Sequence, residues 1–198
     1  MKHSNRFLFW AAPLMLLAAS PVYAHPLHGM VGGFAGGLLH PLLGIDHLLA
    51  MVAVGVWAAQ LGGSALWKIP LAFVCTLLIG AGLGQAGIGL PMIEPMVAAS
   101  VLVLGLAISL RARMAPLLAS LLVAVFALFH GHAHMSELTV GASALTYVIG
   151  FTLTTALLHG TGIVAGYLLQ RQLHETAMRV TGIGVAGIGV YLLAGLWS

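Results

Sequence analysis

Apolar residues dominate the chain beyond its first 24 positions and form six long runs separated by short polar breaks. The runs cover 28–62, 67–87, 93–110, 115–135, 141–170 and 177–197. A helix that spans a bilayer needs about 20 mainly apolar residues. Each run therefore predicts one membrane crossing, and the pattern as a whole predicts an all-α polytopic membrane helix bundle with six transmembrane helices.

The first run is too long for one simple crossing and is interrupted by Pro41 and Gly44. Proline removes a backbone donor and favours a break in a helix. Irregular backbone at membrane depth is tolerated only where it is buried in protein or lines a polar cavity. We therefore expect a short or re-entrant helix near 28–39, followed by a full helix from about 45 to 62.

The N-terminal segment has the pattern of a secretory signal peptide. Lys2 and Arg6 form a basic start, residues 7–19 are apolar, and the segment ends in small residues at Ala24. Cleavage after Ala24 leaves His25 as the first residue of the mature chain. The predicted domains are a signal peptide, 1–24, and one transmembrane domain, 25–198. An uncleaved first membrane helix is the alternative.

Composition points to lipid as the surrounding solvent. The chain has 61% hydrophobic and 6% charged residues, whereas soluble domains carry about 25% charged residues. It has no basic stripe that could neutralise nucleic-acid phosphates, so a nucleic-acid partner is not expected. Cys75 is the only cysteine, which excludes an intrachain disulfide and a cysteine-based zinc site.

The charged residues set the expected topology. With the mature N-terminus in the periplasm and six crossings, every Lys and Arg of the mature chain falls on the cytoplasmic side, as the positive-inside rule requires. These residues are Lys68, Arg111, Arg113, Arg171 and Arg179. An alternative topology with seven crossings places three of these five basic residues outside the cytoplasm. We therefore predict a bacterial inner-membrane protein with both mature termini outside.

Polar residues inside the first run form the first candidate site. His40, Asp46 and His47 lie there although an Asp at the centre of a bilayer helix costs roughly 2.5–3.5 kcal/mol. On one unbroken helix the two histidines would stand ~10 Å apart along the axis, too far to share an ion at metal–nitrogen distances of ~2 Å. The break can fold His40 back towards the pair, and Met51 can add a soft thioether. The alternative is that Asp46 and His47 form a hydrogen bond that only packs helices.

Three histidines at the end of the fourth run form the second candidate site. His130 and His134 are one helical turn apart, a spacing that suits two ligands of one ion, and Glu137 continues the stripe. His132 points elsewhere on a regular helix. The alternative is a histidine-rich loop end at the membrane surface.

The remaining candidates lie deeper in the membrane or at its outer side. His159 shares a helix face with Thr155 and can relay an ion or a proton at mid-membrane, or make an interhelical hydrogen bond. Glu94 lies at the start of the third crossing. It is either a metal ligand or a carboxylate that only marks the start of the helix. His25 and His28 lie at the outer mouth.

Enzyme motifs are absent from the sequence. It has no His-Glu-x-x-His zinc helix, no Gly-x-Ser-x-Gly nucleophile turn and no Walker loop. We therefore predict no enzymatic activity and no resident cofactor. A membrane-embedded metalloenzyme that keeps its ion, and a structural accessory subunit, stay open as alternatives.

The three histidine motifs together resemble the HupE/UreJ family of bacterial membrane proteins. The likeness rests on the segment from His40 to His47 with Met51, on the segment from Phe129 to His134 with Glu137, and on the segment from Gly150 to Gly160. The resemblance implies a secondary permease or facilitator for nickel, sometimes cobalt, that supports hydrogenase or urease. Related nickel/cobalt permeases have one residue fewer between the first His and the Asp, and Met135 stands where many family members have Gly.

The sequence thus predicts uptake of a divalent transition metal, with Ni²⁺ as first choice, as the transported substrate. Neutral imidazoles suit Ni²⁺ or Co²⁺ better than Mg²⁺ or Ca²⁺, and uptake should fall below about pH 6 because protonated imidazole cannot bind a metal. The expected partners are the ion and the lipid bilayer, and a homo-oligomer stays open. The hypothetical roles are capture by His25 and His28, selection by His40, Asp46 and His47, support from His130, His134 and Glu137, and an inward route along His159 and Glu94.

Overall fold

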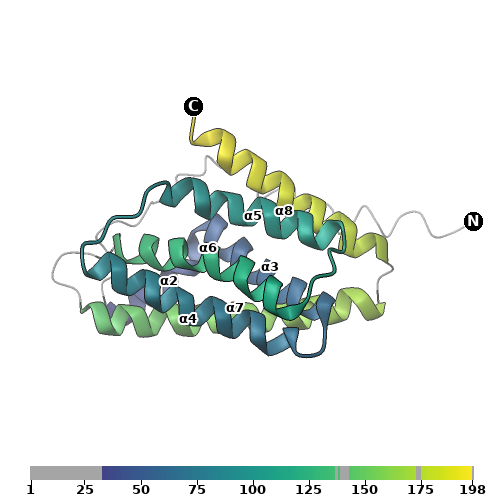
Figure 1. The fold of residues 1–198 in the computed structure, drawn as a ribbon, viewed down its shortest axis with the longest axis horizontal. Helices are drawn as coiled ribbons and strands as arrows, with labels where there is room; N and C mark the ends of the chain where they lie inside the picture. Colours follow the sequence, from purple (N-terminus) through teal and green to yellow (C-terminus); the bar gives the residue numbers. More distant parts are fainter. Residues whose placement is uncertain (1–32, 137, 139–142, 173–174, 198) are drawn as a thin grey trace, which may run out of the picture.

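The computed structural model describes residues 33–136, 138, 143–172 and 175–197, and every regular element in these ranges is an α-helix. The helices are α2 (Gly33–Leu43), α3 (Ile45–Leu61), α4 (Ala65–Gln85), α5 (Ile93–Ser109), α6 (Pro116–Ser136), α7 (Ala144–Gln172) and α8 (Glu175–Gly195) (Figure 1). The predicted all-α class is confirmed. From α4 onward, the predicted runs agree with the helices to within three residues at either end. The predicted signal peptide lies outside the described residues.

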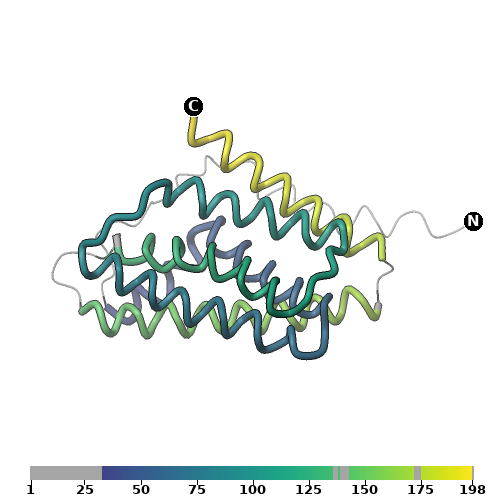
Figure 2. Tube along the Cα trace, viewed as in Figure 1, coloured from purple at the N-terminus to yellow at the C-terminus, as the bar shows by residue number. Residues whose placement is uncertain are grey.

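The described helices make this a multi-pass membrane protein. By length and composition α4, α6, α7 and α8 can each cross a membrane, and the bent pair α2–α3 gives a fifth span if it is counted as one. The α5 helix has 17 residues, short of the ~20 expected for its run. The count of six crossings therefore stays a prediction. Figure 2 shows α4, α6 and α7 running along the long axis of the molecule, with α8 inclined to them.

The first run is broken as expected, but the break falls at Gly44. The α2 and α3 helices meet there at a bend of 78°. Pro41 lies inside α2 and does not end it, which corrects the predicted helix end near residue 39. Proline forfeits only one backbone bond, and the amide of Gly44 still donates to the carbonyl of His40 at 3.2 Å. A Cβ at Gly44 would lie 2.9 Å from Oδ1 of Asp46, so a side chain at this corner would displace the Asp46 carboxylate.

Reciprocal glycine contacts set how closely the helices approach. The main neighbours are α2 and α3 against α7, α4 against α6, and α5 against α8. In the α4–α6 pair, Gly131 faces the carbonyl of Leu77 while Gly80 faces the carbonyl of Leu128. A side chain at either glycine would overlap the opposite backbone. Small residues permit such close packing in membranes, where helices gain nothing from the hydrophobic effect against each other.

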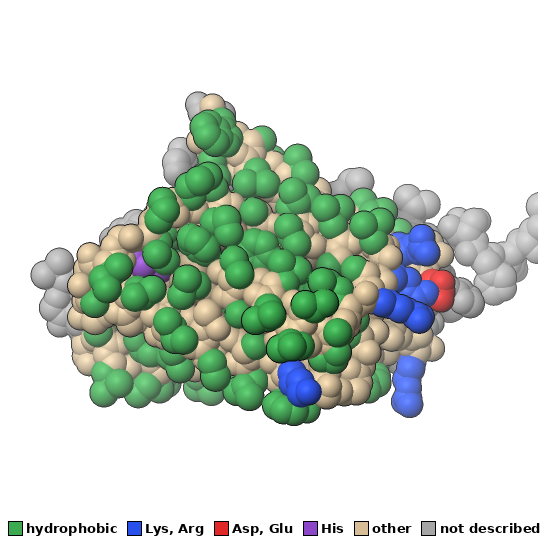
Figure 3. Space-filling model, viewed as in Figure 1, with side chains coloured by type: hydrophobic (Ala, Val, Ile, Leu, Met, Phe, Trp, Pro, Cys, Tyr) green, Lys and Arg blue, Asp and Glu red, His purple; other side chains and the backbone are tan. Residues whose placement is uncertain are grey.

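The outer surface is apolar over most of its length and basic at one end. Large exposed apolar side chains include Leu71, Ile79, Leu117, Leu157 and Ile183. Lys and Arg side chains gather towards one end of the visible face, and histidine shows towards the other (Figure 3). At the basic end Arg111 pairs with Glu175, which joins the α5–α6 connection to the start of α8. Such an apolar belt fits a lipid environment.

Candidate metal centre

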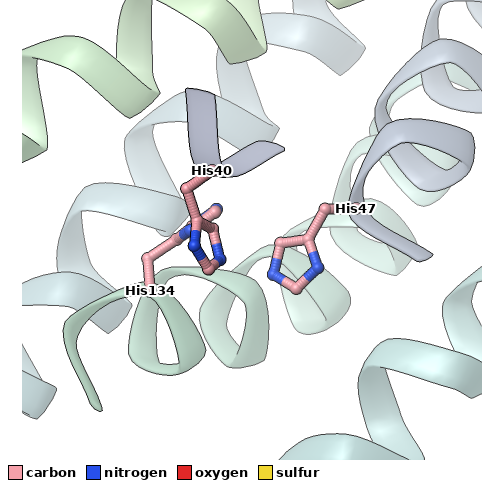
Figure 4. Close-up of side chains that lie close together, drawn as sticks. All are labelled: His40, His47 and His134. Atoms are coloured by element: carbon pink, nitrogen blue, oxygen red, sulfur yellow. The ribbon is translucent and has the colours of Figure 1, made fainter. Parts of the chain in front are cut away.

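Three histidines from three helices meet inside the bundle. They are His40 of α2, His47 of α3 and His134 of α6, and their candidate ligand atoms all lie within 4.8 Å of one another. Figure 4 shows the three rings turned towards a common region. The ring centroids are 5.4 Å apart for His40 and His47, 4.7 Å for His40 and His134, and 4.6 Å for His47 and His134. Within the described ranges this is the only such group of three or more His, Cys, Asp or Glu side chains.

The bend at Gly44 explains how the first two of these rings meet. It folds His40 back over the start of α3, so two residues that would stand about two turns apart on a straight helix come into ring contact. An ion bound at about 2.1 Å from each nitrogen would need the nitrogens roughly 3–3.5 Å apart. The cluster is thus close to a ligating geometry, and each ring has to move by only about 1 Å to reach it.

Asp46 orients His47 and is not part of the three-histidine group. Its Oδ1 accepts hydrogen bonds from Nδ1 of the His47 ring at 2.8 Å and from the His47 backbone amide at 2.7 Å. Because a carboxylate only accepts, the ring proton sits on Nδ1 and the lone pair on Nε2. A carboxylate that fixes the tautomer and raises the basicity of a histidine is a common partner of metal-ligating imidazoles.

His134 is a buried imidazole of α6 that packs against an aromatic ring of α7. Its ring is 0% exposed and stacks on Phe151 with centroids 4.6 Å apart and planes at 11°. Neither ring nitrogen has a hydrogen-bond partner among the described residues. Leaving a buried polar atom unpaired costs about 1–3 kcal/mol. A bound cation would offset that cost, so the burial of His134 favours a ligand role over simple packing.

Two further imidazoles continue the line of rings. The His130 ring lies 5.1 Å from that of His47, measured between centroids. His159 of α7 is buried, and both of its ring nitrogens lack partners among the described residues. The Phe73 ring packs against both, at 5.6 Å from His130 and 5.0 Å from His159. Phe73 therefore contacts both of these imidazoles.

The structure sets the other predicted residues apart from the cluster. His132 points away from it, as expected, and its Nε2 donates to the carbonyl of Ile88 at 2.9 Å, which ties α6 to the α4–α5 connection. Glu94 is exposed in the first turn of α5 and is outside the group. The remaining predicted ligands, His25, His28 and Glu137, lie outside the described residues.

Several residues around the cluster were not singled out as site residues from the sequence. Tyr147 and Phe151 form an aromatic wall on α7 against His40 and His134. Their spacing of one helical turn, continued by Thr155, is the signal that could have found them.

Thr155 itself donates to Sδ of Met51 at 3.3 Å, so these two side chains are paired with each other. No local signal marks Phe73, because its place depends on how α4 packs.

The fold and the cluster define a class of protein: a multi-pass helical membrane protein with a buried, histidine-rich candidate metal site. The model of the HupE / UreJ protein family matches residues 13–192, and the chain belongs to that family. It is 43% identical over 178 residues to Protein HupE of Rhizobium leguminosarum bv. viciae, covering 89% of this chain and 93% of that protein. No solved structure matches the chain. Membership of the HupE / UreJ family supports, in broad terms, a role in nickel or cobalt transport linked to hydrogenase or urease.

Proposed function

We propose that the protein is a secondary transporter or facilitator that takes up a divalent transition metal, first of all Ni²⁺, across the inner membrane. The metal would supply the maturation of a hydrogenase or urease. The observation that carries the proposal is the meeting of three imidazoles from α2, α3 and α6 inside a membrane bundle. Ionisable residues inside membrane helices are rare and typically mark ion or proton pathways.

The donor set supports a borderline transition metal as the substrate. Three imidazole nitrogens surround the candidate site, and Asp46 turns its Oδ1 to His47. Mg²⁺ and Ca²⁺ prefer oxygen ligands, whereas imidazole suits Ni²⁺, Co²⁺, Cu²⁺ and Zn²⁺. Cu²⁺ would bind most tightly by raw affinity, so selection for Ni²⁺ has to come from geometry or from metal availability.

The distribution of charge supports a position of the three-histidine cluster on the periplasmic side. The start of α6 adjoins the connection that carries Arg111 and Arg113, whereas His134 lies in its last turn. If the basic end faces the cytoplasm, as the positive-inside rule favours, the three-histidine cluster lies towards the periplasm. His25 and His28 would then serve capture at the outer side, Glu137 would support the cluster, and His159 and Glu94 would serve the route inward. The ion is cargo in this proposal, and no catalytic step is needed.

Replacing Asp46 by Asn tests the proposal in proteoliposomes loaded with the purified protein. Wild type should take up radiolabelled nickel, and D46N should reduce uptake at subsaturating nickel by about tenfold or more, because loss of a carboxylate partner weakens metal binding by roughly 10- to 100-fold. Asn keeps an oxygen that can accept both hydrogen bonds from His47, so the change isolates the effect of the charge. Glu175→Gln, which removes a carboxylate at the basic end, is the matched control and should leave uptake unchanged.

Two other outcomes would favour the alternatives. Wild-type protein that keeps stoichiometric metal through purification and shows no nickel flux would be a metal-retaining protein. If D46N lowers the yield of assembled protein but leaves the uptake per molecule unchanged, the histidines serve only to join helices.

A further inference from the structure

The His47 ring lies at the centre of the imidazole cluster. It contacts the rings of His134, His130 and His40, with centroids 4.6, 5.1 and 5.4 Å away. Two of these three neighbours complete the three-histidine group, and His130 is the one outside it. His47 therefore contacts one imidazole beyond the three-histidine group.

His130 has the properties of a ligand without belonging to that group. It is 0% exposed, and its Nδ1 lies 3.0 Å from the carbonyl oxygen of Phe126, one turn earlier on α6. A carbonyl only accepts, so the proton sits on Nδ1 and the lone pair on Nε2. That Nε2 is fully buried and has no hydrogen-bond partner among the described residues. Helix packing alone does not account for a lone pair held unpaired in this position.

We propose that His47 and His130 form a second, inner metal station, and that the ion moves inward by exchanging ligands while His47 stays bound. The outer station is the group of His40, His47 and His134, so this inference rests on the proposed transport function. His130 and His134 are one turn apart on α6, so replacing one by the other as a ligand moves the ion inward along that helix. Because the ion stays about 2 Å from Nε2 of His47, this movement is at most about 4 Å unless the His47 ring turns with the ion. A shared ligand spares the ion a fully unliganded passage between the two stations.

The two stations differ in how firmly they can hold an ion. The outer one offers three imidazoles and the inner one two, so the ion passes from a tighter to a looser set of protein ligands. Conduction needs sites that are favourable enough to enter and weak enough to leave. The Phe73 ring packs against both His130 and His159.

His130→Gln separates the inner station from the outer one. Nickel binding is measured by equilibrium dialysis of the purified full chain with radiolabelled Ni²⁺, and uptake is measured in proteoliposomes. H130Q should bind nickel within about threefold of the wild-type affinity yet take it up about tenfold more slowly, in line with the loss expected for a perturbed metal site. His134→Gln should weaken both binding and uptake. His132→Gln, whose native ring is bonded to the Ile88 carbonyl, is the control on the same helix and should preserve both.

Two results would overturn the inference while leaving the transport function intact. Binding by H130Q that is weakened as much as binding by H134Q would make His130 a ligand of the outer station. Uptake by H130Q at the wild-type rate would remove any need for an inner station. If H130Q is not monodisperse in detergent, His130→Asn is measured in the same two assays, and the same outcomes decide. Absence of nickel uptake by wild type would instead refute the proposed function itself.

Discussion

His47→Gln should abolish nickel uptake and weaken nickel binding by more than the roughly 10- to 100-fold that loss of an outer-shell partner costs. His47 touches three other imidazoles, and it belongs to both the outer and the proposed inner station. It is also the residue that Asp46 orients. The substitution therefore removes a ligand from each station, and no other single change in the cluster does so.

Equilibrium dialysis and proteoliposome uptake with radiolabelled nickel measure this effect. H132Q is again the matched control, because His132 is a buried histidine that binds a backbone carbonyl and not the cluster. Thermal unfolding in the same detergent establishes that H47Q remains folded. A folded H47Q that binds nickel with the wild-type affinity would show that the three-histidine group is not the metal site.

The helices could be read from the sequence because their signal is local. An apolar run must match the thickness of the bilayer, and a polar break must follow it. This is why the ends of α4 to α8 agree with the runs to within three residues. The break in the first run was also local, since Pro41 and Gly44 mark it. The bend angle of 78° and its position at Gly44 could not be read from local sequence, because they depend on what α2 packs against.

The membership of the cluster could be predicted only in part. Sequence spacing placed His130 and His134 on one helix face, and a break offered a way to bring His40 to His47. Spacing could not show that His134, and not Asp46, is the third member of the group. That depends on the depth at which α6 lies beside α2 and α3, which is a property of packing between segments far apart in the chain.

Gly131 is one of the residues that set this depth. It directly follows His130 and lies where α6 touches the backbone of α4 at Leu77. Gly131 therefore helps to position the histidines beside it, although it has no side chain that could bind a metal.

Gly131→Ala should destabilise the protein by about 1–3 kcal/mol, the usual cost of overpacking a close contact. The expected direction of this change in stability is informative, because Ala in place of Gly inside a helix ordinarily stabilises the helix by roughly 0.5–1 kcal/mol. Gly160→Ala is the matched control: Gly160 also follows a histidine, and a Cβ there would meet nothing within 4 Å. Unfolding of the two variants in the same detergent, followed by nickel binding, measures the difference.

The comparison also tests how the metal site is built. G160A should unfold at or above the wild-type temperature and bind nickel normally, whereas G131A should unfold earlier and bind nickel more weakly, because α6 has to move away from α4 and carries His130 and His134 with it. Equal stability of G131A and wild type would mean that the α4–α6 contact does not set the position of these rings. A loss of stability with unchanged nickel affinity would separate helix packing from ligand placement, and the depth of α6 would then have to be fixed by its contacts with the other helices.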